Sequence, residues 1–199
     1  WIVFSNSLTT DVSMWDTEVA QLKDRYRILR YDTRGHGQTE AAPGPYSFDV
    51  LVGDVIALMD AMGIDKAHYV GLSLGGMTGL GVAIEHGDRL LSLSACDARP
   101  FADPEWAAPW VDRIALARDK GMEALVEPTV ARWFTEDFQK VASNAPLMDH
   151  VRKMIRETVA HMVHPWRQKG PTRKSFSKHL KGVGVFGDTN MWGMSKFKN

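Results

Sequence analysis

Ser73 is the residue of this chain best placed for chemistry, because glycines flank it in the run Gly71-Leu72-Ser73-Leu74-Gly75. Strand-like apolar residues, 67–70, come before this run, and small residues compatible with a helix, 76–84, come after it. A serine on a sharp turn from strand to helix is exposed for nucleophilic attack on a carbonyl carbon. The glycines fit such a turn, which strains the serine backbone and leaves its neighbours no room for side chains. We predict that Ser73 is a catalytic nucleophile of acyl transfer.

A serine hydroxyl needs several partners before it can attack. A histidine must remove its proton, and a carboxylate must orient that histidine. Two backbone N–H groups must also face the oxyanion that develops on the carbonyl oxygen. We expect one N–H from Leu74, the residue after the nucleophile. The second should come from the loop at residues 5–10, where Leu8 is our choice.

The histidine that would serve as the base is not evident from the sequence. His36 lies in a glycine-rich loop, where we interpret it as scaffold, and His68 lies in a strand, where a half-buried structural role is expected. His86 precedes a helix-ending glycine and is expected at the surface. The other four are His150, His161, His164 and His179. None of the seven follows a recognisable final strand, so we expect weak or no activity, since loss of a triad member leaves only residual catalysis.

Two aspartates are candidates for the acid. Asp97 directly follows a predicted strand, a position that some enzymes of comparable architecture use for their acid. Asp188 follows the strand-like run at residues 183–186. There we favour a chance resemblance to a strand and acid, because no histidine comes after Asp188.

Strands and helices alternate over the first half of the chain. Continuous or alternating apolar residues predict strands, and spacings of three and four predict helices. Ser13 and Ser47 are expected N-caps, and Gly63 is expected to end a helix. The predicted strands are 1–5, 26–31, 67–72 and 90–96, and the predicted helices are 14–23, 48–62 and 74–86. This order is typical of an α/β fold with a doubly wound, mostly parallel sheet.

From residue 104 to about 160 the pattern is helical throughout, with helices predicted at 104–119, 122–133 and 146–160. A helical block inserted after a strand fits a cap over an active site, and a plain helical extension is the alternative. We therefore divide the chain into a partial α/β core (1–100), a helical cap (101–160) and a divergent basic tail (161–199).

The charges change abruptly near residue 160. Lys and Arg balance Asp and Glu at 24 each, but residues 160–199 alone carry a net charge of +7. A shifted reading frame or a hybrid tail would explain this. The chain also opens at Trp1 inside a strand-like run, so we interpret the N-terminus as cut. A sheet lacking strands at both ends would expose unpaired edges, and we expect aggregation or self-association unless the tail supplies a strand.

Composition excludes several other classes of protein. A balanced charge predicts no nucleic-acid or membrane partner, and no apolar run is long enough to span a membrane. The single cysteine, Cys96, is expected to be buried and inert, which fits a reducing cytoplasm. No metal-ligand spacing and no phosphate-binding glycine loop is present, so no cofactor is expected.

Several segments resemble 3-oxoadipate enol-lactonase, a family of α/β-hydrolases that open a lactone in bacterial aromatic catabolism. They are Phe4-Ser5-Asn6-Ser7-Leu8 with Asp11 and Met14-Trp15; Arg30-Tyr31-Asp32-Thr33-Arg34-Gly35-His36-Gly37; and Gly71-Leu72-Ser73-Leu74-Gly75-Gly76-Met77. Ala131-Arg132-Trp133-Phe134-Thr135 is similar to part of the family's cap. The likeness covers about residues 1–158.

The resemblance implies an α/β-hydrolase fold with a helical cap, truncated here at both ends. It implies that Ser73 is the nucleophile, that Leu8 and Leu74 supply oxyanion N–H groups, and that Trp133 lines the substrate pocket. The family usually has glycine where this chain has Thr9, a change expected to tighten the oxyanion loop.

The implied substrate is a small carboxylic ester or lactone, above all 3-oxoadipate enol-lactone. A general carboxylesterase or a haloperoxidase-like hydrolase is the alternative within the same chemistry. A third hypothesis is a catalytically dead fragment without the triad histidine, or a module whose basic tail binds anionic lipid or nucleic acid.

Overall fold

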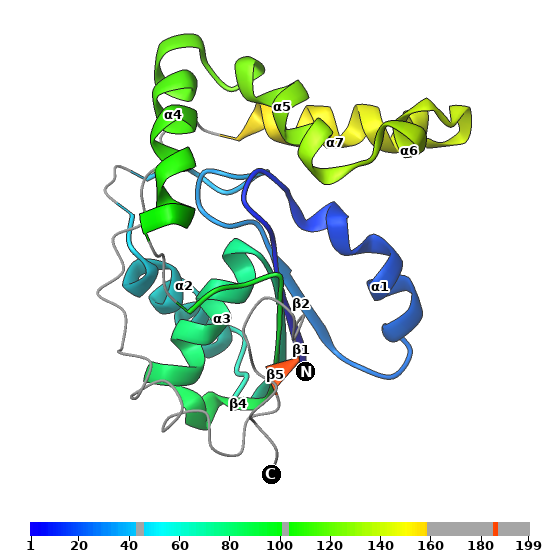
Figure 1. Ribbon diagram of the computed structural model, residues 1–199. Helices are drawn as coiled ribbons and strands as arrows, with labels where there is room; N and C mark the ends of the chain where they lie inside the picture. Colours follow the sequence, from blue (N-terminus) through cyan, green and yellow to red (C-terminus); the bar gives the residue numbers. More distant parts are fainter. Residues whose placement is uncertain (43–45, 101–103, 159–184, 187–199) are drawn as a thin grey trace, which may run out of the picture.

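The computed structural model of the chain describes residues 1–42, 46–100, 104–158 and 185–186 (Figure 1). Its described strands form one parallel sheet in the order β2-β1-β3-β4-β5. They are β1 (Ile2–Ser5), β2 (Ile28–Tyr31), β3 (Ala67–Leu72), β4 (Leu90–Cys96) and β5 (Val185–Phe186). The parallel, doubly wound sheet expected from the alternating pattern is therefore confirmed.

Helices cover both faces of this sheet. The short turn η1 (Val12–Trp15) and α1 (Asp16–Leu22) lie on one face, where Trp15 packs on Phe4 with ring centroids 4.8 Å apart. On the other face lie α2 (Phe48–Ala61) and α3 (Leu74–Glu85), which pack on each other, and α3 also packs on β3 and β4 (Figure 1). A further turn, η2 (Gly87–Arg89), leads into β4.

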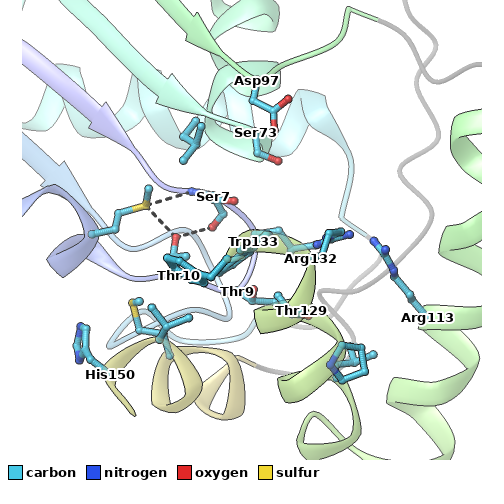
Figure 2. Close-up of a pocket in the computed structure, with 18 of the residues that line it drawn as sticks. Ser7, Thr9, Thr10, Ser73, Asp97, Arg113, Thr129, Arg132, Trp133 and His150 are labelled. Atoms are coloured by element: carbon cyan, nitrogen blue, oxygen red, sulfur yellow. Dashed lines mark hydrogen bonds between the residues drawn. The ribbon is translucent and has the colours of Figure 1, made fainter. Parts of the chain in front are cut away.

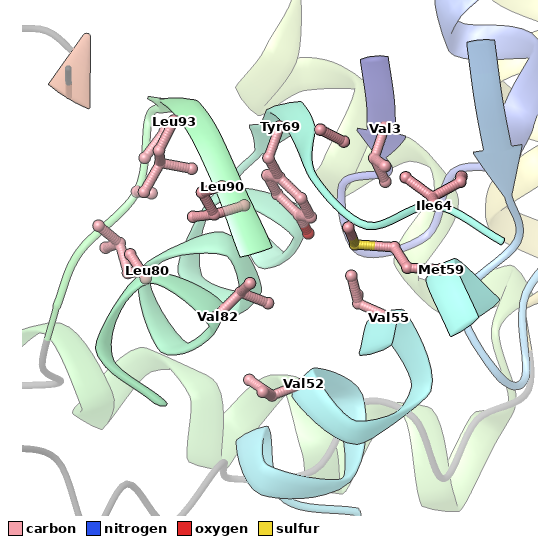
Figure 3. Close-up of a cluster of buried hydrophobic side chains, with 14 residues drawn as sticks. Val3, Val52, Val55, Met59, Ile64, Tyr69, Leu80, Val82, Leu90 and Leu93 are labelled. Atoms are coloured by element: carbon pink, nitrogen blue, oxygen red, sulfur yellow. The ribbon is translucent and has the colours of Figure 1, made fainter. Parts of the chain in front are cut away.

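The main core lies between the sheet and the pair α2 and α3. Figure 3 shows its side chains, with Tyr69 of β3 at the centre and fully buried. The Tyr69 hydroxyl donates to the Gly75 carbonyl at 3.0 Å, which ties the core to the first turn of α3. Burying aliphatic groups here contributes about 25 cal/mol per Å² of apolar surface. The core thus fixes the position at which α3 begins.

Two expected helix signals are confirmed and one is wrong. Ser47 caps α2, since its Oγ accepts from the Val50 N–H at 3.3 Å, and Gly63 follows the helix with φ +65°. Ser13 does not cap the next helix. Asp11 is the N-cap of η1 instead, and its carboxylate accepts from the Ser13 N–H at 2.8 Å. An ionised carboxylate is the stronger acceptor, so the turn begins before Ser13.

The strand at residues 185–186 corrects another expectation. We favoured a chance resemblance for the strand-like run there, but Val185 and Phe186 pair in parallel with Leu93 and Ser94 of β4. The tail therefore supplies a strand beside β4, whose edge would otherwise lie open. Apart from this strand, the predicted basic tail lies outside the described residues.

A second layer of helices lies over the carboxyl ends of the strands (Figure 1). It consists of α4 (Pro104–Lys120), α5 (Glu123–Trp133), α6 (Glu136–Lys140), the turn η3 (Ala142–Asn144) and α7 (Ala145–Glu157), together called the helical unit below. It has its own buried cluster, including Val126, Val130 and Ile155. The three long helices were expected, whereas α6 is too short for periodicity to reveal.

The helical unit is joined to the α/β core by polar and apolar contacts. His150 of α7 lies 2.6 Å, Nε2 to Oγ, from Ser13, and the Asp11 N–H points at the Met154 sulfur at 3.5 Å. Trp110 of α4 packs against the buried cluster of Leu8, Leu51 and Leu74. In the described part of the chain, no helix is both long and apolar enough to cross a lipid bilayer.

Candidate active site

Ser73 lies at the bend between β3 and α3, as the glycine pattern predicted. Its backbone has φ +51° and ψ −110°, a conformation that costs a non-glycine residue roughly 1–3 kcal/mol. Two hydrogen bonds hold it there: the Ser73 N–H donates to Cys96 O at 2.9 Å, and Ser73 O accepts from the Met77 N–H at 2.8 Å. The side chain makes no capping hydrogen bond to α3, so the hydroxyl stays available.

The flanking glycines are explained by how closely the backbone segments approach. A Cβ on Gly71 would lie 2.3 Å from Gly75 O, and one on Gly75 would lie 2.2 Å from Ser5 O. Both distances are far below van der Waals contact, and both obstacles are backbone atoms that cannot rotate away. The crowding comes from the first turn of α3, which packs against β3 and β1 at this bend.

The two expected oxyanion donors lie in the two segments that meet at this bend, the start of α3 and the loop after β1. Leu74 is the first residue of α3, so its N–H has no acceptor within the helix. Leu8 lies in the loop after β1, and its side chain packs with those of Leu51 and Leu74 in one buried cluster. The Gly75 N–H donates to Asn6 O at 3.0 Å, which fastens this loop to the elbow. Their catalytic role remains our prediction.

A cavity of about 790 Å³ opens between the elbow and the helical unit. Figure 2 shows Ser73 and Asp97 at the core side of this cavity and Trp133, Thr129 and the arginines at the other. Leu8 and Thr9 also line it, next to the elbow. The cavity therefore brings together the proposed nucleophile, Leu8 and the expected pocket residue Trp133.

Two arginines in the cavity share one aromatic ring. The guanidinium of Arg113 lies 5.0 Å from the centre of the Trp110 ring, and that of Arg132 lies 6.0 Å from it. Figure 2 shows the two guanidinium groups pointing toward each other. Among the described residues neither forms an ion pair with a carboxylate, and burial lowers the pKa of Arg113. Two facing cations of this kind favour an anion between them.

The described histidines do not hydrogen-bond to Ser73. His36 is buried, and its Nε2 accepts from the Thr9 N–H at 3.0 Å. His68 of β3 contacts Ser92 Oγ through Nδ1 at 2.8 Å, and His86 follows the end of α3. His150 lines the cavity but is bonded to Ser13. The structural roles expected for His36 and His68 fit these positions, and His161, His164 and His179 lie outside the described residues.

Asp97 is the described carboxylate beside the elbow. It follows β4 directly with φ +42°, and Ser73 is anchored on the carbonyl of the preceding Cys96. Burial raises the pKa of the half-buried Cys96 thiol, and the Asp97 charge adds to this. A thiol with a raised pKa is a poor nucleophile, which fits the inert role expected for Cys96. Asp188, the other candidate acid, lies outside the described residues.

Comparison with known proteins decides the family. A sequence model of the α/β-hydrolase fold matches residues 1–173. The chain belongs to the α/β-hydrolase family. Within it, two 3-oxoadipate enol-lactonases of Acinetobacter baylyi are similar: one is 39% identical over 137 residues and the other 40% identical over 139 residues, each 69% of this chain. These stretches are 51% and 50% of the two relatives, so the chain spans about half the length of the curated relatives it matches.

A solved structure agrees with this assignment. The enol-lactonase from Burkholderia xenovorans LB400 is 33% identical, with a TM-score of 0.77 over 94% of this chain and 82% of that one. The resemblance to enol-lactonases seen in the sequence motifs is therefore confirmed. The α/β-hydrolase fold expected from the serine elbow is confirmed as well.

Some features of this α/β-hydrolase site escaped the sequence analysis. Arg113 and Trp110 of α4 gave no signal, because an exposed-looking helical arginine and a tryptophan suggest surface and packing equally well. Asp11 was recognised only as part of a motif, although it caps η1. In the described ranges, no group of three or more His, Cys, Asp or Glu could hold a metal ion.

Proposed function

We propose that this α/β-hydrolase cleaves a carboxylic ester or lactone through an acyl-enzyme on Ser73, with 3-oxoadipate enol-lactone as the best candidate substrate. The observation that carries the proposal is the strained Ser73 backbone at the strand–helix bend, facing the cavity. Similarity to enol-lactonases supports the substrate. Strain at a half-buried serine that lines a cavity, between crowded glycines, favours a nucleophile over a simple turn.

The chemistry follows from the groups around the elbow. Ser73 Oγ would attack the lactone carbonyl, its proton passing to a base, while the Leu8 and Leu74 N–H groups stabilise the oxyanion. Collapse of the tetrahedral intermediate breaks the ring C–O bond, and the released enol oxygen takes a proton and tautomerises to a ketone. Water then cleaves the acyl–Oγ bond, which gives a carboxylic acid and restores the Ser73 hydroxyl.

The arginine pair favours this lactone over a neutral ester. Adipate has two carboxyl groups and the lactone uses one, so the substrate keeps one free carboxylate. Arg113 and Arg132 face each other at the cavity wall on the Trp110 ring. A carboxylate between them would replace like-charge repulsion with charge-assisted hydrogen bonds, each contributing about 1.5–3 kcal/mol.

Turnover of the enol-lactone against p-nitrophenyl acetate tests the substrate. We expect the lactone to be the better substrate by kcat/KM, and Arg113→Met to raise its KM about 10-fold or more. The acetate ester lacks a carboxylate, so its KM should change less than about threefold. Arg118→Met, an exposed arginine on the same helix, is the matched control and should alter neither KM. Equal turnover of both substrates would favour a general carboxylesterase.

Labelling by a fluorophosphonate tests the nucleophile and its base together. Rapid labelling of the wild type that disappears in Ser73→Ala would show an activated serine. Slow labelling would support the expectation that the chain has weak activity, because an unassisted serine reacts slowly. Rapid labelling that persists in Ser73→Ala would overturn the assignment of the nucleophile.

A further inference from the structure

The loop after β1 is held by a contact that the proposed mechanism does not use. Thr9 is β-branched yet has φ +66°, a conformation that costs a residue with a Cβ about 1–2 kcal/mol. Its N–H donates to His36 Nε2 at 3.0 Å, and both residues are buried. An unfavourable conformation persists only where its surroundings enforce it. This hydrogen bond is therefore one of the contacts that hold the Thr9 backbone in place.

The two neighbours of the imidazole determine where its proton lies. The Thr9 N–H can only donate, so Nε2 must be unprotonated. The Arg34 carbonyl, 3.2 Å from Nδ1, can only accept, so Nδ1 must carry the proton. Both nitrogens of a neutral ring are then satisfied. His36 therefore has no lone pair left to accept a proton from Ser73.

The Thr9 N–H belongs to the peptide unit next to the proposed oxyanion donor. Fixing the Leu8–Thr9 peptide fixes the backbone on the carboxyl side of Leu8, while the Leu8 side chain is held by Leu51 and Leu74. Across the same loop, the Thr10 hydroxyl donates to Ser7 O at 2.9 Å. Loss of the His36 contact would free the left-handed turn at Thr9 to relax, and the Leu8 N–H would move with it.

We propose that His36 is a positioning residue: its Nε2 fixes the Thr9 peptide and so aims the Leu8 N–H at the oxyanion. This inference rests on the proposed function, because it assumes a carbonyl substrate at Ser73. A histidine that served only as scaffold for its own loop would need the Arg34 contact alone. An apolar residue would fill the same buried space without the cost of burying a polar ring.

Burial favours the neutral state of the ring, although a carboxylate lies near it. Burial lowers the pKa of His36, and the Asp32 carboxylate opposes this shift from the loop after β2. That carboxylate is itself occupied, since it accepts from the Val12 N–H at 2.7 Å and the Gln38 N–H at 3.1 Å. The guanidinium of Arg34 pairs with Asp54, with Nε 2.7 Å from Oδ2, so its charge is balanced.

Three substitutions at His36 separate positioning from folding. In His36→Gln, the side-chain oxygen reaches about as far as Nε2 and can still accept from Thr9. In His36→Asn the oxygen is too short, and His36→Leu has no acceptor. For p-nitrophenyl acetate we expect kcat to fall about 10–100-fold in the Asn and Leu variants, with KM changed less than about threefold. His36→Gln should stay within about threefold of the wild-type kcat.

Controls make this comparison decisive. His68→Gln changes a histidine bonded to Ser92 and should leave kcat unchanged. If His36→Leu fails to fold, the Gln and Asn variants still provide the comparison, because they differ only in how far the side-chain oxygen extends toward the Thr9 N–H. Equal kcat for folded Gln and Asn variants, or a wild-type kcat in folded His36→Leu, would overturn the proposal.

Nitrogen-15 NMR of the wild-type imidazole gives a readout that needs no activity. We expect an unprotonated Nε2 and a protonated Nδ1 at neutral pH, with Nε2 coupled to the Thr9 amide across the hydrogen bond. A protonated Nε2 would overturn the inference even if the chain hydrolyses esters. Conversely, absence of hydrolysis in the wild type would count against the proposed function and leave this tautomer as a separate finding.

Discussion

Gly75 lies against the backbone of Ser5 so closely that a Cβ on Gly75 would come within 2.2 Å of the Ser5 oxygen. Gly75→Ala must therefore push α3 away from β1 and disturb the bend that holds Ser73. We expect a loss of about 3 kcal/mol in the free energy of unfolding, measured by urea denaturation, with loss of Ser73 labelling.

Gly53→Ala is the control for this substitution. Gly53 lies inside α2 with no atom within 4 Å of an added Cβ. Alanine there should raise the free energy of unfolding by about 0.5–1 kcal/mol, because glycine is costly in a helix interior. If both alanines had the same effect, crowding at the elbow would not be the cause.

Ser73→Gly should stabilise the protein while abolishing its reactivity. Glycine accepts the φ of +51° that strains serine, so we expect a gain of about 1 kcal/mol in the free energy of unfolding. Ser73→Ala keeps the strain and should change stability by less than about 0.5 kcal/mol. Thermal unfolding of the two variants measures the difference, and a destabilised Ser73→Gly would mean that the bend is not strained.

The bend at Ser73 was predictable because its signals are local. A strand, a helix and two glycines within a few residues predict both the turn and its exposed serine. The bounds of β3 and the start of α3 agree with that expectation, since core packing and the glycine pattern require the same boundary. The loop after the first strand gave Leu8 and the family motifs added Trp133, and the structure places both at one cavity.

Features that depend on distant contacts could not be predicted. The Arg113 and Arg132 pair requires α4 and α5 to present their side chains to one ring, Trp110, and no sequence spacing encodes that. The strand at Val185–Phe186 was not expected, because no histidine follows it and it lies in an atypical segment, yet it pairs with β4. The contact of Thr9 with His36 likewise joins two loops 27 residues apart.

Thr9→Gly should also stabilise the protein. It removes a β-branched residue from φ +66° and a buried hydroxyl that has no hydrogen-bond partner among the described residues. These gains exceed the entropic cost of glycine, so we expect about 1 kcal/mol more stability in urea denaturation.

Thr10→Gly is the matched control in the same loop. The Thr10 hydroxyl donates to Ser7 O, and Thr10 is not among the described residues with positive φ. Its replacement should therefore cost about 1–2 kcal/mol. Destabilisation by Thr9→Gly equal to that by Thr10→Gly would show that the Thr9 backbone is not strained.

Stability should fall on the acid side because of His36. Burial lowers its pKa in the folded state below the value of about 6.5 in the unfolded chain, so the unfolded state binds the proton more readily. This contribution is complete above about pH 6.5 and is lost as the pH falls toward the folded pKa.

Over that range the free energy of unfolding of the wild type should fall by up to about 1.4 kcal/mol per pH unit more than that of His36→Gln, whose side chain does not titrate. Urea denaturation of both proteins at about pH 7.5 and pH 5 measures the difference. Parallel pH profiles for wild type and His36→Gln would show that the buried imidazole does not resist protonation.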